Sequence, residues 1–319
     1  MKILSKTKIA MSEKEHEITE TGAFSRQQNR FTTPFGEGPD RLPVEAGRYR
    51  LIVSNGCPWA HRQLIVLRLL GLEDVISIGR VGPRTEKGWE FSLDTGGLDP
   101  VLGIRYLPEA YEKADPAYSG RATVPAVVEI ATGKVVNNDY HRLSNYWETA
   151  WKIFHKEGAP DLYPEALRPE IDALNETLFH EVNNAVYKAG FAQTQAEYEK
   201  AYDLLFGRLD ALEERLSKNR YLFGDKITDS DVRLWVTLVR FDAGYYMAFK
   251  TNRNRLVDFH NLWNYAKDLY QTPAFGDTTD FATIKRTYQL ISNPSGIISA
   301  GPDTSVWLLP HDRGENHGL

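Results

Sequence analysis

The chain has 319 residues, of which 42% are hydrophobic and 25% are charged, and its net charge is -5. This composition is typical of a globular protein that can bury one large core or two smaller ones. The acidic balance offers no broad basic surface for phosphate groups, which argues against nucleic acid as the main partner. Small molecules are therefore the expected ligands.

The apolar segments and the cysteine content bear on the cellular compartment. Ser5, Lys6 and Lys8 interrupt the first apolar residues, so no signal-peptide core forms, and no later run is long enough to span a membrane. Cys57 is the single cysteine, and a chain without an intramolecular disulfide fits a reducing compartment. We expect a cytoplasmic protein that does not bind membranes.

The first residues of the chain are expected to form an N-terminal arm. Residues 1–45 are polar, contain several glycines and prolines, and lack sustained helical or strand periodicity, which predicts an extended segment. A short apolar run in residues 48–56 then ends at an Asn-Gly pair and predicts a buried strand. Helical spacing follows over residues 58–70, with Pro58 in the first turn and Gly71 as a stop.

Further segments complete an α/β domain. Residues 75–79 predict a second strand, and the apolar runs at 124–130 and 134–136, separated by a short turn, predict a hairpin. A closing helix is expected over residues 142–151. The resulting order is β-α-β followed by β-β-α within residues 46–155.

Helical periodicity dominates residues 160–300, which predicts a second, all-α domain. Apolar and aromatic residues step by three and four through residues 198–216. Thr228 and Asp231 have the spacing of a capping-box variant, so a buried helix is expected to begin there. Residues 301–319 are rich in glycine and proline and predict an irregular tail.

Cys57 lies between the predicted strand and the predicted helix. Unpaired backbone N–H groups and the positive end of the helix dipole stabilise a thiolate at such a position, so we expect a lowered pKa. An isolated cysteine is more often buried and inert, but the strand-turn-helix context favours a reactive one. The second cysteine of a dithiol motif would stand at Ala60, so an external thiol must resolve any mixed disulfide on Cys57.

Other catalytic arrangements find little support. His61 lies one turn after the cysteine, but a structural role is favoured because the helix terminus already accounts for activation. The eight histidines and one cysteine lack the spacing of metal ligands, so no metal site is expected. No glycine-rich phosphate loop is recognised either.

The motifs CPWAHR, TVP, NNAVYKAGF, DVRLWVTLVRFD and NPSGIIS occur in this order. Together they resemble the glutathionyl-hydroquinone reductases, the Xi class of glutathione transferases, over about residues 50–301. The resemblance implies a thioredoxin-like thiol-binding domain at 46–155 and a helical glutathione-transferase-type substrate domain at 160–300. It also implies a homodimer that reduces an aromatic glutathionyl-hydroquinone to hydroquinone and glutathione disulfide.

The resemblance assigns roles to four residues. Cys57 would be the nucleophile that takes the glutathionyl sulfur, and Tyr187 would donate a proton to the ring carbon. Tyr245 and Tyr288 match tyrosines whose hydroxyls point at the thiolate and lower its pKa. Packing at the core edge is the competing role in a chain with 16 tyrosines, and the adjacent Tyr246 leaves the match to Tyr245 ambiguous by one residue.

The same resemblance predicts a thiol-binding site. Trp89, Arg121, Thr123 and Val124 occupy positions that are similar to the family's glutathione contacts. The bond between Val124 and Pro125 resembles the cis X-Pro bond of thioredoxin-like folds, which exposes backbone to the bound thiol; an ordinary trans proline at a strand start is the alternative.

The sequence departs from the family at the site for the γ-glutamyl end of glutathione. The family has a Glu-Ser pair there, whereas this chain has Asp139 and Tyr140. Aspartate keeps the charge on a shorter side chain, and tyrosine replaces a small hydroxyl with a bulky ring. Two explanations stay open: glutathione bound in an adjusted pose, or another low-molecular-weight thiol such as mycothiol or bacillithiol.

Two classes of function follow from these observations. The first is a thiol-dependent reductase of the glutathionyl-hydroquinone reductase kind. The second is a non-enzymatic binder of thiol conjugates or aromatic ligands on the same fold. A serine- or tyrosine-type conjugating transferase is disfavoured, because a cysteine at the helix start forms mixed disulfides.

Overall fold

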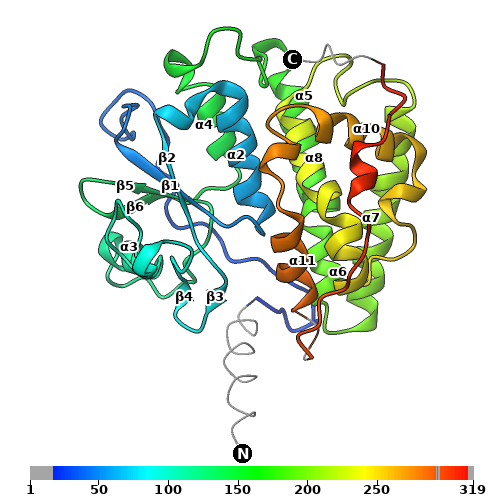
Figure 1. Cartoon of the computed structure of the whole chain (residues 1–319), viewed down its shortest axis with the longest axis horizontal. Coiled ribbons are helices and arrows are strands. Elements are labelled where there is room, and N and C mark those ends of the chain that lie inside the picture. The colour runs from blue at the N-terminus through cyan, green and yellow to red at the C-terminus, as the bar shows by residue number, and fades with distance from the viewer. Residues whose placement is uncertain (1–16, 292, 294, 315–319) are drawn as a thin grey trace, which may run out of the picture.

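The computed structural model of the chain describes residues 17–291, 293 and 295–314. A lobe built on a β-sheet lies beside a lobe built from helices, coloured from blue to green and from green to red respectively (Figure 1). The expected combination of an α/β domain with an all-α domain is confirmed. Within the described ranges, no helix is both long and apolar enough to cross a membrane.

A four-stranded sheet forms the centre of the first lobe, with the strand order β2-β1-β5-β6. Strand β1 (Tyr49–Val53) is wholly buried, runs parallel to β2 (Ser77–Arg80) and is antiparallel to β5 (Ala126–Glu129). The predicted hairpin is confirmed, since β5 pairs antiparallel with β6 (Lys134–Asn137). Because β1 lies between two strands, the loop that follows it leaves the middle of the sheet edge.

Helix α2 (Pro58–Leu70) has the bounds that the sequence predicts. Gly71 adopts φ 74° and closes the helix through its backbone N–H, which is the left-handed cap that glycine favours. The closing helix α4 (Leu143–Glu148) is shorter than the predicted residues 142–151, because the chain turns into a 3-10 segment at Lys152–Phe154. Helix α2 packs against α4 and, across the lobe boundary, against α8.

Sequence periodicity did not reveal the short elements between β2 and β5. Strands β3 (Arg84–Thr85) and β4 (Gly88–Trp89), of two residues each, pair antiparallel in a short hairpin. Helix α3 (Pro108–Ala114) follows. Each is too short to show a period. The hairpin nevertheless matters for the site, because it carries Trp89.

The second lobe is helical, as expected for residues 160–300. Its helices are α5 (Arg168–Leu178), α6 (Ala185–Phe191), α7 (Gln195–Leu216), α8 (Asp229–Arg240), α9 (Tyr246–Ala248), α10 (His260–Gln271) and α11 (Phe281–Gln289). Two π-helical turns interrupt them, at Phe179–Asn183 and Phe241–Tyr245. The described 3-10 segments of this lobe are Glu165–Leu167, Leu256–Asp258, Gly276–Thr278 and Ser305–Leu308, while Leu72–Asp74 and Thr95–Gly97 belong to the sheet lobe.

Helix α8 runs through the core of this lobe, and all of its residues are buried. The predicted capping box at its start is confirmed: the Asp231 carboxylate accepts hydrogen bonds from the backbone N–H and the hydroxyl of Thr228, both at 2.8 Å. Asp231 also accepts hydrogen bonds from the Leu222 N–H and the Tyr265 hydroxyl, both at 2.9 Å. This carboxylate therefore ties the beginning of α8 to two other segments.

The C-terminal tail is less irregular than the sequence predicts. Trp307, in the 3-10 segment Ser305–Leu308, is buried, with its ring 4.8 Å from Trp263 and 5.3 Å from Tyr270 of α10. Apolar burial organises the tail where glycine and proline content suggested none. The predictions for residues 1–16 and 315–319 lie outside the described residues.

Residues 17–45, which we call the arm, connect the two lobes. Phe31 exchanges hydrogen bonds with Asn138 of the sheet lobe, at 3.0 Å and 2.8 Å. On the other side, the Arg26 Nε donates to Asn184 at 2.9 Å, and the Gln193 N–H donates to the Gly22 carbonyl at 2.8 Å. The arm is irregular, with turns at residues 19–23 and 34–42, and it is fixed to both lobes.

The capping box makes a prediction about stability. We expect Thr228→Ala to lower the free energy of unfolding by about 1 kcal/mol, as for other lost caps. Asp231→Ala should cost about 3 kcal/mol, because it also leaves buried partners unpaired. Urea denaturation followed by circular dichroism measures both values. Equal costs for the two variants would contradict this account of Asp231.

Candidate active site

Cys57 is the N-cap residue of α2 and follows the turn that leaves β1. Its backbone is extended, and its carbonyl accepts the His61 N–H at 2.9 Å, which begins the helix. The thiol donates a 3.4 Å hydrogen bond to the Val124 carbonyl, which lies just before β5. The bond between Val124 and Pro125 is cis, as the resemblance implied. The sheet therefore brings the cysteine and this loop together.

The expected lowering of the Cys57 pKa is wrong for this structure. Burial raises the pKa of the thiol above its ordinary value, and this effect is larger than the opposing ones. The backbone N–H groups of Ala60 and Trp59 and the positive charges of Arg240 and Arg26 act in the expected, lowering direction. Cys57 is half-buried beside apolar groups, and a sequence shows the start of a helix but not this packing, which explains the error.

The three tyrosines named from the sequence meet at one point. The Tyr187 hydroxyl, from α6, lies 2.8 Å from the Tyr288 hydroxyl, from α11, and 3.3 Å from that of Tyr245. Tyr245 donates to Tyr288 at 3.4 Å, and Tyr288 donates to the Gly56 carbonyl at 3.3 Å. Segments separated by about a hundred residues thus form one hydroxyl cluster next to Cys57.

One expectation about the tyrosines needs correction. The Cys57 thiol hydrogen bonds to Val124 rather than to a tyrosine, and Tyr245 is fully buried and is not part of the cavity wall. Burial raises the pKa of all three phenols, so they stay protonated at neutral pH. Tyr245 is fully buried in the cluster, which favours it over its half-buried neighbour Tyr246.

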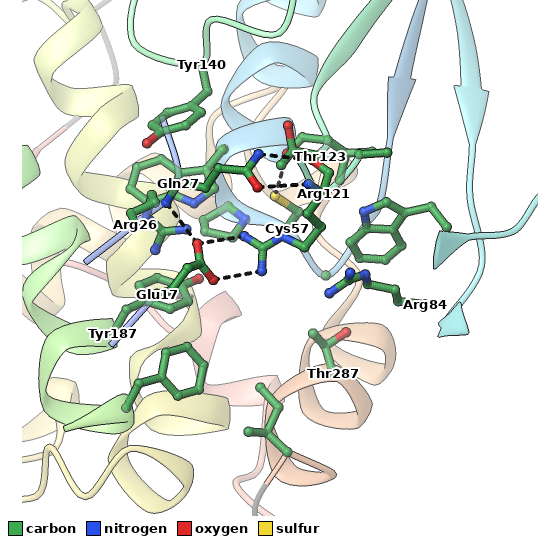
Figure 2. A pocket seen from close by; sticks show the side chains of 18 of the residues that line it. Glu17, Arg26, Gln27, Cys57, Arg84, Arg121, Thr123, Tyr140, Tyr187 and Thr287 are labelled. Atoms are coloured by element: carbon green, nitrogen blue, oxygen red, sulfur yellow. Dashed lines mark hydrogen bonds and ion pairs between the residues drawn. The ribbon is translucent and has the colours of Figure 1, made fainter. Parts of the chain in front are cut away.

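A cavity of about 240 Å³ opens beside Cys57, between the two lobes (Figure 2). Tyr187 and Tyr288 form part of its wall on the helical side, together with Phe191 and Ile291. Most of the wall is therefore aromatic or aliphatic, and Cys57 is at its sheet side. Such a cavity suits a planar aromatic group held close to the sulfur.

Most of the predicted thiol-binding residues line this cavity. Trp89, Arg121, Thr123 and Val124 do so from the sheet lobe. Tyr140 also lines it, and its ring centroid lies 5.1 Å from that of Trp59. The proposed thiol contacts therefore share one cavity with Tyr187 and Tyr288.

Asp139 does not fit the prediction. Its carboxylate is not part of the cavity wall, and it accepts hydrogen bonds from the Asn29 amide at 3.3 Å and from the His141 N–H at 3.1 Å. A short side chain at the start of a turn satisfies its own backbone, which draws the charge away from the cavity. Tyr140 alone of this pair remains available to a ligand.

The arm supplies a wall of the cavity that the sequence prediction missed. Glu17 lines it and pairs with both terminal nitrogens of Arg121, each at 3.0 Å. Gln27 accepts the Arg121 N–H at 2.8 Å and donates to the Arg121 carbonyl at 3.1 Å. Phe24 and Arg26 complete this wall. Only the mixture of charged and aromatic residues in the arm hinted at such a role, because the segment has no periodicity.

Arg240 was also missed, although it supports the turn before the cysteine. It is fully buried at the end of α8 and donates to the carbonyls of Asn55 and Gly56, both at 3.2 Å. A Cβ on Gly56 would lie 2.2 Å from the Thr287 hydroxyl, so α11 packs tightly against this turn. Two helices of the second lobe therefore fix where the cysteine stands.

His61 has the structural role that the sequence favours. Its Nε2 lies 2.8 Å from the Thr278 hydroxyl, and its Nδ1 lies 3.1 Å from Arg240. Burial, and then the charge of Arg240, hold the pKa of His61 well below its ordinary value, so the ring is neutral. Among the residues that the structure describes, no group of three or more acidic, histidine or cysteine side chains could hold a metal ion.

Comparison with known proteins places this site in a family. The model for the glutathione S-transferase N-terminal domain matches residues 56–150, and the model for the C-terminal domain matches residues 195–268. Glutathionyl-hydroquinone reductase YqjG of Escherichia coli (strain K12) is 39% identical over 310 residues, covering 93% of this chain and 92% of that protein. The chain belongs to the glutathionyl-hydroquinone reductase family.

Solved structures agree with this assignment to the glutathionyl-hydroquinone reductase family. A glutathione transferase from Gordonia bronchialis is 53% identical, with a TM-score of 0.87 over 92% of this chain and 91% of that one. The Xi-class transferase of Phanerochaete chrysosporium is 39% identical, with a TM-score of 0.86 over 92% and 97%. The glutathione-bound structure of E. coli YqjG gives a TM-score of 0.81 over 92% and 97%.

The raised pKa of Cys57 can be measured in this member of the glutathionyl-hydroquinone reductase family. Only the thiolate reacts with iodoacetamide, and Cys57 is the single cysteine, so the rate of alkylation reports its ionisation. Because burial raises the pKa, we expect the rate to rise with pH at a higher midpoint in the folded protein than in urea. A lower midpoint in the folded protein would show that the helix terminus dominates after all.

Proposed function

We propose that the chain is a thiol-dependent reductase that removes a glutathionyl group from S-conjugated hydroquinones through a mixed disulfide on Cys57. The observation that carries this proposal is the position of the cysteine, at a helix N-terminus on the wall of an aromatic cavity. Tyr187 and Tyr288 lie on another wall of the same cavity. The named activity of the E. coli relative, YqjG, supports the same reaction.

The first half of the reaction transfers sulfur to the cysteine. The Cys57 thiolate attacks the sulfur of the conjugate, so an S–S bond forms and the aryl C–S bond breaks. The electron pair of that bond stays with the aromatic ring, which is thereby reduced. Because burial disfavours the free thiolate, the N–H groups of Ala60 and Trp59 and the charge of Arg240 must stabilise it when the substrate excludes water.

The ring carbon gains a proton in the same half-reaction. Tyr187 is the proposed donor, because it lines the cavity and its raised pKa keeps it protonated. Once Tyr187 has lost its proton, the Tyr288 and Tyr245 hydroxyls, at 2.8 Å and 3.3 Å, can turn to donate hydrogen bonds to its oxygen. The tyrosine cluster thus stabilises the phenolate left on Tyr187 rather than the thiolate.

A second thiol completes the cycle. It attacks the mixed disulfide, releases a small disulfide and restores the Cys57 thiol. No other cysteine exists in the chain to do this, so the thiol must come from outside. We propose glutathione, which is bound in the structure of E. coli YqjG.

The geometry at Asp139 and Tyr140 favours a second candidate for the thiol. Asp139 is held by its own turn, and Tyr140 stacks beside Trp59, so this segment offers no free carboxylate for a glutamyl ammonium. The same reaction with mycothiol or bacillithiol needs no such carboxylate partner for a γ-glutamyl group. Contacts to Trp89 and to the backbone near Val124 serve any of these thiols.

We further propose that the protein acts in the cytoplasm as a homodimer. A single cysteine that cycles between thiol and mixed disulfide requires a reducing compartment. The homodimer rests on the family resemblance. Analytical ultracentrifugation at several concentrations tests it, and a monomer throughout would contradict it.

Two variants test the reaction itself. With glutathionyl-hydroquinone and glutathione, we expect Cys57→Ala to lose at least about 10³-fold in rate, because the nucleophile is gone. Tyr187→Phe should lose about 10²-fold through the missing proton donor. Tyr246→Phe, a control outside the cluster, should stay at the wild-type rate. Chromatography of released hydroquinone gives the rates, and turnover by Cys57→Ala at the wild-type rate would refute the mechanism.

The same assay identifies the thiol. Glutathione, mycothiol and bacillithiol are offered separately to the wild-type protein, and thiol disulfides are quantified with hydroquinone. We expect equal amounts of hydroquinone and disulfide with the true co-substrate. Release with mycothiol or bacillithiol only would replace glutathione, and no release with any thiol would support the non-enzymatic binder.

A further inference from the structure

The arm places one positively charged side chain, Arg26, on the cavity wall among aromatic rings (Figure 2). Its guanidinium carbon lies 4.7 Å from the ring centroid of Tyr187 and 5.2 Å from those of Trp59 and Phe24. The Nε donates to Asn184 at 2.9 Å. The cation therefore lies between the ring of Tyr187, the proposed proton donor, and the ring of Trp59 in the first turn of α2.

Part of this guanidinium has no acceptor. The Nη2 atom is buried and lacks a hydrogen-bond partner among the described residues. The hydrogen bond to Asn184 uses Nε, and the neighbouring Nη2 does not share this acceptor. An unpaired buried N–H is unfavourable, and contacts with ring faces compensate only partly. A ligand that brings an acceptor oxygen would remove this cost.

The charge of Arg26 is also uncompensated, in contrast to its neighbour. The Glu17 carboxylate, which also lies on the cavity wall, pairs with both terminal nitrogens of Arg121. Within the described part of the chain, no carboxylate forms an ion pair with Arg26. Arg121 is therefore neutralised inside the protein, whereas Arg26 keeps its charge for an anion in the cavity.

The proposed reaction, on which this inference rests, produces such an anion. When Tyr187 protonates the ring carbon of an ionised hydroquinone conjugate, the phenolate oxygen becomes a ketone. Attack of the Cys57 thiolate on the sulfur then breaks the C–S bond, and the electron pair restores the aromatic ring and the phenolate. The oxygen thus carries negative charge at the beginning and the end of this half-reaction, before a proton from solvent gives the hydroquinone.

We propose that Arg26 binds the ionised phenolic oxygen of the aromatic substrate and selects rings that carry such an oxygen. Figure 2 shows Arg26 near Tyr187 and Tyr140, on the other side of Cys57 from Arg84. A ring beside Tyr187 would place an oxygen at the guanidinium while its sulfur faces the cysteine. Arg26 would then touch the substrate directly and stabilise its developing charge.

Binding of 4-nitrophenol tests this proposal without the reaction, because its absorbance distinguishes the phenol from the phenolate. Cys57→Ala protein is used, so that the thiol cannot ionise. If Arg26 binds the phenolate, the pKa of bound 4-nitrophenol should fall by about one unit, which corresponds to ten-fold tighter binding of the anion. The added substitution Arg26→Gln should abolish this shift, and Arg26→Lys should retain part of it.

Two controls separate charge recognition from structure. Arg30→Gln removes an exposed arginine of the same arm that pairs with Asp115, and it should leave the shift unchanged. Binding of 4-nitroanisole, which cannot ionise, should be equal with and without Arg26→Gln. Equal losses for both ligands would mean that Arg26 only shapes the cavity and would overturn the proposal, as would an unshifted pKa or no binding of 4-nitrophenol.

Turnover distinguishes failure of this inference from failure of the proposed function. With wild-type Cys57, Arg26→Gln should lower the rate most for conjugates whose hydroquinone is the weakest acid, because those need the cation most. Hydroquinone release that is equally slowed for all conjugates would leave the reductase intact and refute the role of Arg26. If the wild-type protein releases no hydroquinone but still lowers the pKa of bound 4-nitrophenol, the proposed reductase activity is refuted. The proposed phenolate-binding role of Arg26 then still holds.

Discussion

Hydrogen bonds from Arg240 to the carbonyls of Asn55 and Gly56 hold the turn that positions the Cys57 sulfur. The guanidinium is fully buried at the end of α8, and the two acceptors directly precede Cys57. A buried guanidinium with several fixed acceptors cannot move without leaving donors unpaired, so this contact is rigid. The capping box at Asp231 fixes the other end of α8, and the helical lobe thereby holds the cysteine of the sheet lobe.

The same arrangement explains why the cavity needs both lobes. The sheet lobe contributes the sulfur and the loop at Val124, while the helical lobe contributes Tyr187 and Tyr288. Burial in this interface raises the pKa of the thiol and of the phenols alike. At rest the site therefore holds its protons, and the positive charges of Arg240 and Arg26 become important only when a sulfur or an oxygen must carry negative charge.

The sequence predicted those parts of the fold that have a clear local signal. Helix α2 ends at Gly71 as expected, because a left-handed glycine cap is encoded in two or three residues. The tyrosine cluster was found through motifs that lie far apart in the chain. The arm could not be placed in this way, since Arg26 belongs to a segment without periodicity that is ordered only by contacts with both lobes.

Two errors in the predicted site have a common cause. The pKa of Cys57 was expected to be low from the helix N-terminus, and Asp139 was expected to face the ligand from its match to an acidic residue of the family. Both expectations infer the environment of a side chain from the position of its residue in the sequence. Burial of the thiol and the turn that captures the Asp139 carboxylate are properties of the packed structure, and local sequence does not report them.

A single turnover without resolving thiol tests the central claim, that Cys57 itself takes the sulfur. Reduced protein would be mixed with excess glutathionyl-hydroquinone, and intact mass and released hydroquinone would be measured together. We predict one glutathionyl adduct on Cys57 for each hydroquinone released, reversed by added glutathione. Hydroquinone released without an adduct on the cysteine would contradict the account.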